Sequence, residues 1–132
     1  MKSIINNIRT LLMLLLVFII NSGISAKEIN YKTAEQVAIN AFVLHSGINI
    51  NELNIIEVIP FTETKYVVFY IFNFEQGHIV ISADDIVEPV LGYGLYSNIN
   101  LSKLPSGLSY LLNHFKKEIS FARNNVKTTS TT

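Results

Sequence analysis

Two adjacent carboxylates, Asp84 and Asp85, have the residue types and spacing that come nearest to a general acid–base pair in this sequence. They follow an apolar run that predicts a buried strand. Adjacent side chains on an extended chain point to opposite sides, so these two carboxylates do not flank one substrate bond as a catalytic pair must. An aspartate at a strand end more commonly accepts hydrogen bonds from backbone amides in a turn. We therefore expect Asp84 and Asp85 to shape a turn.

The other side chains able to do chemistry do not form a catalytic set. His45, His78 and His114 have no spacing typical of a metal site. His78 and Ser82 share one face of a predicted strand, but roughly 13 Å separates them, too far for a base to activate a nucleophile. The chain has no cysteine, which excludes thiolate chemistry and disulfides. We predict no catalytic residue, no metal and no cofactor.

Residues 1–26 have the pattern of an export signal. Lys2 and Arg9 give it a basic start, and residues 11–20 are all apolar. Residues 22–26 (SGISA) offer the small side chains typical of a signal-peptidase cleavage site. The ten apolar residues are about half of the roughly 20 that span a bilayer, which favours a cleaved signal over a retained anchor. We therefore expect a mature chain that starts at Lys27, is secreted or periplasmic, and has no membrane association.

Removal of residues 1–26 leaves 106 residues, enough for one domain with a modest core. Its 8 basic and 10 acidic residues give a net charge of −2. Such a chain lacks the basic surface of a nucleic-acid-binding protein. We expect residues 27–126 to form the domain, as a monomer, and the polar residues 127–132 to be a disordered tail.

Hydrophobic spacing predicts a helix near each end of the domain. Apolar residues recur at helical intervals over residues 34–42, after a capping box that starts at Thr33 and before Gly47, which can end the helix. A second helix, opened by Pro105, keeps the same spacing over residues 108–122.

The region between the helices predicts antiparallel strands. The strand from Tyr66 to Phe74 is apolar on both alternating faces, so it is expected in the centre of the sheet. Gly77 is expected to take positive φ in the next tight turn. The expected fold class is α+β, an antiparallel sheet of four or more strands flanked by an N-terminal and a C-terminal helix. The predicted strands cover residues 53–59, 66–74, 78–83 and 90–95, with a hairpin turn at residues 62–65.

Residues 77–94 (GHIVISADDIVEPVLGYG) resemble the signature of one family. That family comprises the prodomains of streptopain-type cysteine peptidases and the free-standing inhibitors built on the same module. Its signature is a Gly-aromatic-Val-Ile-Val-Ser-Ala-Asp-Asp run followed by Pro-x-Leu-Gly-Tyr. This chain departs from it at His78, Ile86 and Gly94, where an aromatic, a basic residue and a serine are common. The matching residues are Gly77, Ile79, Val80, Ile81, Ser82, Ala83, Asp84, Asp85, Pro89, Leu91, Gly92 and Tyr93.

The resemblance, which covers about residues 29–121, implies a bacterial inhibitor and not an enzyme. The parent peptidases need a cysteine nucleophile, and a prodomain with its own export signal implies an inhibitor that blocks a streptopain-type cysteine peptidase in trans. In zymogens of the family the prodomain docks over the active-site cleft. The implied contact residues are Ile86, Glu88, Pro89, Tyr93, Tyr96, Asn98 and Asn100, and the implied structural residues are Gly77, Ser82, Asp84, Asp85, Leu91 and Gly92.

Other interpretations of the same residues are open. Tyr93 could instead pack under the second helix, with Asn98 and Asn100 only solvating a loop. An exported binding or adhesion module could use the same fold for another partner, since fold alone does not fix function. The chain could also be the remnant of a peptidase gene that lost its catalytic part.

Overall fold

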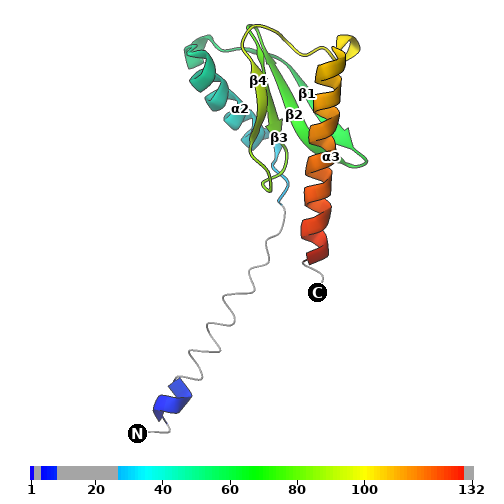
Figure 1. Ribbon diagram of the computed structural model, residues 1–132. Coiled ribbons are helices and arrows are strands. Elements are labelled where there is room, and N and C mark those ends of the chain that lie inside the picture. Colours follow the sequence, from blue (N-terminus) through cyan, green and yellow to red (C-terminus); the bar gives the residue numbers. More distant parts are fainter. Residues whose placement is uncertain (2–3, 9–26, 130–132) are drawn as a thin grey trace.

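The computed structural model describes residues 1, 4–8 and 27–129 (Figure 1). The predicted signal, residues 1–26, lies mostly outside these residues. None of the described helices is both long enough and apolar enough to cross a membrane. The elements are α2 (Tyr31–Ser46), η1 (Ile50–Glu52), β1 (Ile55–Glu63), β2 (Tyr66–Phe74), β3 (His78–Ser82), β4 (Val90–Gly94), η2 (Leu101–Lys103) and α3 (Ser106–Thr129).

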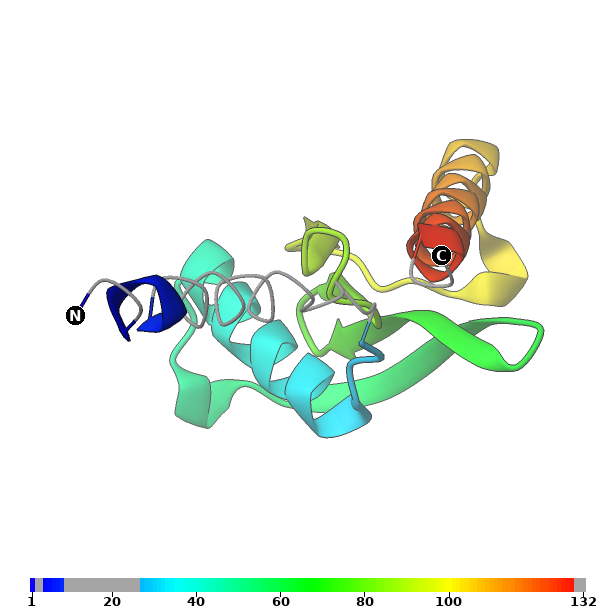
Figure 2. The ribbon, with the colours of Figure 1, turned by 90° about the horizontal axis from the view of Figure 1, so that it is seen from below.

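The sheet has the order β1-β2-β3-β4 with every neighbouring pair antiparallel, and one helix lies on each face (Figure 2). Side chains alternate between the two faces of a strand. In β2, Tyr70, Phe72 and Phe74 pack in the cluster with α2, whereas Phe69 and Ile71 pack in the cluster with α3. The predicted α+β fold and the central position of β2 are therefore confirmed.

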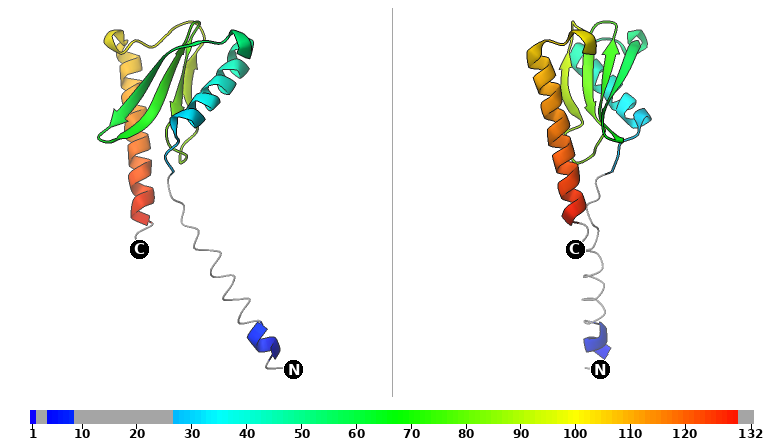
Figure 3. Two further views of the ribbon diagram at one scale, coloured as in Figure 1. Left: turned by 180° about the vertical axis from the view of Figure 1, so that it is seen from behind. Right: turned by 90° about the vertical axis from the view of Figure 1, so that its right-hand side faces the viewer.

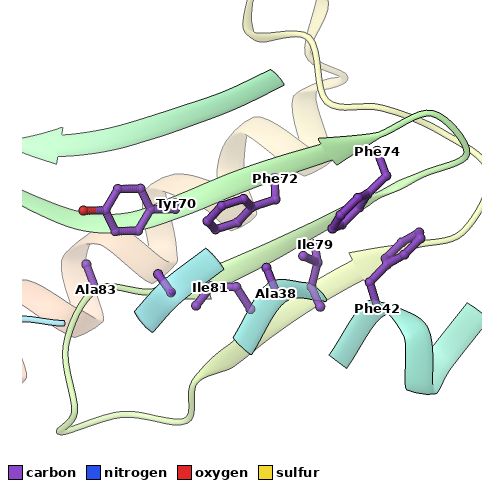
Figure 4. Packing of buried hydrophobic residues seen from close by; sticks show 9 residues of the cluster. Ala38, Phe42, Tyr70, Phe72, Phe74, Ile79, Ile81 and Ala83 are labelled. Atoms are coloured by element: carbon purple, nitrogen blue, oxygen red, sulfur yellow. The ribbon is translucent and has the colours of Figure 1, made fainter. Parts of the chain in front are cut away.

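Helix α2 lies close to the sheet because its buried face is built from small residues. Ala34 and Ala38 are completely buried, and the ring of Phe42 stacks on that of Phe74 with centroids 4.3 Å apart (Figure 4). Ile79 and Ile81 of β3 complete this cluster. Helix α3 contacts β1 and β2 on the opposite face, where Leu112 and Ile119 are buried, and its C-terminal turns extend beyond the sheet (Figure 3).

Two details of α2 test the predicted helix boundaries. The side chain of Asn30 accepts a hydrogen bond from the Thr33 backbone N–H at 2.9 Å, so Asn30 is the N-cap and the predicted capping box at Thr33 is wrong. Gln36 donates to Asn40 instead of reaching back. At the other end Gly47 stops the helix at φ 71°, as predicted.

The β1–β2 hairpin is longer and tighter than predicted. Strand β1 covers Ile55–Glu63, where residues 53–59 were expected, because the polar residues after Phe61 continue the pairing with β2. Glu63 is paired with Tyr66, so Thr64 and Lys65 alone form the turn, with Thr64 at φ 57°. Edge strands accommodate polar residues because one side faces water, which is why these residues resembled a loop.

Gly77 is required for close approach and not for positive φ, so that prediction was wrong. Among the described residues, positive φ occurs at Gly47 and Thr64. A Cβ on Gly77 would lie 2.2 Å from the carbonyl oxygen of Gly94 on β4. Any side chain here would push the β2–β3 turn away from the end of β4.

Helix α3 differs from its prediction on its exposed face and at its end. Leu111 lies within the apolar spacing of residues 108–122 but is 42% exposed, while its neighbour Leu112 is buried. The helix continues through residues 127–129, where a disordered tail was expected. Residues 130–132 of that tail lie outside the described part of the chain.

Candidate functional site

The loop that follows β4 is held in place by one buried side chain of β2. Asn73 is 1% exposed, and its amide oxygen accepts a hydrogen bond from the Ile99 backbone N–H at 2.9 Å. Its amide nitrogen donates to the Ile99 carbonyl oxygen, also at 2.9 Å. The side chain of Asn73 thus makes with one loop residue the two bonds that a neighbouring strand would make. Ile99 itself is 2% exposed and packs in the α3-facing cluster.

The second N–H of the Asn73 amide is also used. It donates to a carboxylate oxygen of Glu57 on β1 at 2.9 Å, so both donors and the acceptor of this buried amide are satisfied. Asn73 was not among the residues predicted to matter. The signal in the sequence was a single polar amide in an otherwise apolar strand (YVVFYIFNF), since a buried polar group needs a hydrogen-bond partner.

A second anchor for this loop comes from β3. The Nδ1 atom of His78 donates to the carbonyl oxygen of Ser97 at 2.5 Å. His78 is paired with Gly94 across the β3–β4 ladder, and a Cβ on Gly94 would lie 2.5 Å from the His78 ring. The two departures from the family signature therefore fit each other, because the absence of a side chain at Gly94 provides the space that the imidazole occupies.

Between and beside these anchors, the predicted contact residues of the loop are exposed. Tyr96 is 94% exposed, the highest value for an aromatic residue in the described chain, and Asn98 is exposed as well. The side chain of Asn100 accepts a hydrogen bond from the Ser102 backbone N–H at 2.9 Å, so it caps η2. The arrangement presents one aromatic ring and one amide from a loop whose backbone is fixed on either side.

One interpretation of the sequence placed Tyr93 under the second helix. In the structure Tyr93 contacts α2 instead. Its ring stacks on that of His45 at the end of α2, with centroids 4.1 Å apart and the planes 12° from parallel. Tyr93 remains 48% exposed. Its ring therefore forms a surface platform at the same end of the sheet as the loop after β4, because β4 ends one residue later.

The turn after β3 holds the two aspartates in different environments. Asp84 is buried, forms an ion pair with Arg123 of α3 at 2.5 Å, and accepts a hydrogen bond from the Ile86 backbone N–H at 3.3 Å. The Ser82 hydroxyl bridges the backbone N–H and carbonyl of Asp84, both at 3.0 Å. Asp85 is exposed and binds the Lys27 backbone N–H at 2.8 Å. Asp84 thus accepts from a backbone amide of its own turn, whereas Asp85 bonds the N-terminal segment, and the ion pair with Arg123 is one that the sequence did not predict.

The other predicted contact residues lie on this second loop. Glu88 and Pro89 are exposed and Ile86 is half-buried, while the Pro89 carbonyl accepts a hydrogen bond from the Ser82 N–H at 2.9 Å. This loop precedes β4 and the Asn73-anchored loop follows it, so they lie at opposite ends of that strand (Figure 1). Five residues of strand lie between the two loops, so the chain travels about 20 Å from Pro89 to Leu95. The structure does not gather the predicted contact residues into one patch.

A surface depression lies elsewhere, between the β1–β2 turn and α3. It has a volume of about 400 Å³ and its lining includes Tyr66, Ser120 and Arg123. Arg123 is already committed to Asp84 and lies over the Tyr66 ring, 5.2 Å from its centroid. Within residues 1, 4–8 and 27–129, no three His, Asp or Glu side chains are grouped so that they could hold a metal ion.

The structure is thus a small α+β domain that fixes an exposed loop on a buried scaffold. The family model described as Spi protease inhibitor matches residues 26–119, which is most of the chain. The chain therefore belongs to this family of protease inhibitors. Neither a curated protein nor a solved structure matched it.

Proposed function

We propose that this protein is an exported inhibitor of a streptopain-type cysteine peptidase, which it blocks at the active-site cleft as a prodomain acting in trans. Membership of a protease-inhibitor family supports a protease as the partner. The cysteine-peptidase target rests on the resemblance of residues 77–94 to the streptopain prodomain signature. The function needs no catalytic residue or cofactor, only a stable surface on a monomeric domain.

The observation that carries this proposal is the anchored loop after β4, residues 95–100. An inhibitor that is not consumed must occupy the cleft without the flexibility that lets a substrate adjust to the catalytic groups. Ordering a free loop costs roughly 1–2 kcal/mol per residue, and a loop ordered before binding avoids this cost. The buried amide of Asn73 and the imidazole of His78 fix the loop backbone at Ile99 and Ser97. Tyr96 then projects into solvent from an ordered backbone.

Tyr96 and Asn98 suit the centre of such a contact. Aromatic residues are enriched among the few side chains that dominate binding energy, because they bury a large area at little entropic cost. The stacked pair of Tyr93 and His45 extends this surface along the end of the sheet. The loop of Glu88 and Pro89, at the other end of β4, would contact only a partner that extends along the edge strand.

One titration tests the proposal. Residues 27–132 are added to a streptopain-type peptidase and, as a control, to a papain-type peptidase, and residual activity is measured with a small peptide substrate. We expect stoichiometric inhibition of the first enzyme only, with the inhibitor recovered intact by mass spectrometry. Lack of inhibition by a folded domain would favour a binding module for another partner. Cleavage of the folded inhibitor as fast as of the denatured chain would show that it is a substrate.

A further inference from the structure

The first described residues of the domain make an isolated β-bridge to the turn that follows β3. The Ile29 N–H donates to the Ala83 carbonyl at 2.9 Å, and Glu28 forms an antiparallel bridge with Asp84. The Asp85 N–H donates in turn to the Lys27 carbonyl at 3.4 Å. The backbone of residues 27–29 therefore has a defined place on the turn that follows β3.

This place brings the backbone nitrogen of Lys27 to a carboxylate. The nitrogen lies 2.8 Å from Oδ1 of Asp85, which is a normal length for a charge-assisted hydrogen bond. In the uncleaved chain this nitrogen is a neutral amide with one N–H. The residues before it, SGISA, are those predicted to be cut when the signal is removed.

We propose that Asp85 is the binding site for the α-ammonium group that signal removal creates on Lys27. A signal peptidase hydrolyses the Ala26–Lys27 peptide bond with one water, leaving a carboxylate on Ala26 and an ammonium on Lys27. The nitrogen that carries the new positive charge is the one that already faces Asp85. Processing thus converts a hydrogen bond from a neutral amide to a carboxylate into an ion pair between the same two atoms.

The surrounding charges favour this assignment. Asp84, the other carboxylate of the turn, is neutralised by Arg123 of α3, so Asp85 is the carboxylate that the new ammonium meets. Glu28, which makes the isolated bridge, is exposed and lies near Tyr70 of β2, whose pKa is raised by burial and, to a smaller extent, by Glu28. The side chain of Lys27 adds a positive charge of its own. Among the groups named here, three carboxylates (Asp84, Asp85 and Glu28) stand against two cations (Arg123 and the Lys27 side chain).

The proposal predicts a raised pKa for the new α-amino group. Its ordinary value is about 7.7–8.0, and a carboxylate within hydrogen-bonding distance favours the charged form. The added stability is then fully present below about pH 7.7 and is lost as the pH rises through the folded-state pKa. Tyr70, with its raised pKa, stays neutral through this range and does not contribute.

The test compares chains with defined N-termini, released from a removable fusion partner. One chain starts at Lys27 and the other at Ala26, which moves the ammonium about 3.8 Å along the chain. Each chain is made with Asp85 intact and as the variant Asp85→Asn. The variant Glu88→Gln, in the same loop, is the control for the loss of one negative charge. Both hydrophobic clusters lie wholly within residues 29–123, so every chain contains the complete core.

We expect the Lys27 chain to have an α-amino pKa, measured by NMR titration, above that of its Asp85→Asn variant, with Glu88→Gln close to the parent. At pH 6.5 its folding equilibrium constant should exceed that of the Ala26 chain by about two- to fivefold, as for an exposed ion pair. This difference should vanish at pH 9.5 and in the Asp85→Asn background. Equal α-amino pKa values with and without Asp85 would overturn the proposal. So would an exported protein whose intact mass shows a start other than Lys27.

Discussion

Replacing Asn73 tests whether the contact loop is ordered before it meets a partner. In Asn73→Ala the backbone N–H and carbonyl of Ile99 lose their partners, and so does the carboxylate of Glu57. Each lost hydrogen bond between neutral groups costs about 1 kcal/mol, and the bond to a charged group somewhat more. The loop can recover part of this by moving into water. We therefore expect unfolding free energy to fall by about 2–3 kcal/mol.

Asn73→Asp is the sharper variant because it keeps the shape of the side chain. Its carboxylate can still accept from the Ile99 N–H, but it cannot donate to the Ile99 carbonyl and it faces the carboxylate of Glu57. At pH 8 we expect it to be less stable than Asn73→Ala, despite being closer in size to asparagine. Asn54→Ala, which removes an exposed amide bonded to Glu75, is the matched control and should change little.

Two measurements separate loop order from general stability. Hydrogen exchange should show faster exchange of the Ile99 amide in Asn73→Ala, while the amides of β3 remain protected. Inhibition should weaken at least tenfold, equivalent to about 1.4 kcal/mol, because the enzyme must then order the loop itself. Unchanged protection at Ile99 together with an unchanged melting temperature would refute the proposed role of Asn73.

Three further predictions follow from other contacts. The double variant of Tyr96→Ala and Asn98→Ala should weaken inhibition at least about tenfold with the melting temperature unchanged, since both side chains are exposed; unaltered inhibition would move the contact to the loop before β4. Arg123→Met should lower the unfolding free energy by about 3 kcal/mol, because it leaves a buried carboxylate without its partner. A variant as stable as the parent in urea unfolding would contradict this. Gly94→Ala should destabilise the protein through its clash with the His78 ring, and His78→Ala should relieve most of that loss. Additive losses in the double-mutant cycle would show that the two sites are not coupled.

The position of the contact surface has consequences for the type of complex. The anchored loop and the turn before β4 lie at opposite ends of the same edge strand, which has a neighbour on one side only. A partner that contacts both loops must therefore extend along this strand for about 20 Å. Measuring inhibition by variants of Glu88 alone and of Tyr96 alone will show whether the peptidase uses one end of the strand or its whole length.

The sequence by itself determined the order and type of the main helices and strands and which of them are central. The continuous apolar run of β2 predicted a strand covered on both sides, and the apolar spacing over residues 34–42 predicted the helix α2, because local periodicity reflects which side chains must leave water. The signature at residues 77–94 predicted the inhibitor family. Helix N-caps and strand ends were less well predicted, since Asn30 and Thr33 are both good capping residues.

Tertiary structure alone decided which distant residues meet. Nothing local in the sequence links Asn73 to Ile99, Asp84 to Arg123 or the backbone of Lys27 to Asp85, because each pair is joined only when the chain has folded. Periodicity reports whether a side chain is buried, but it does not report which polar group satisfies it. The order of the contact loop depends on such a pairing. It was therefore visible only when β2 and the loop after β4 were seen side by side.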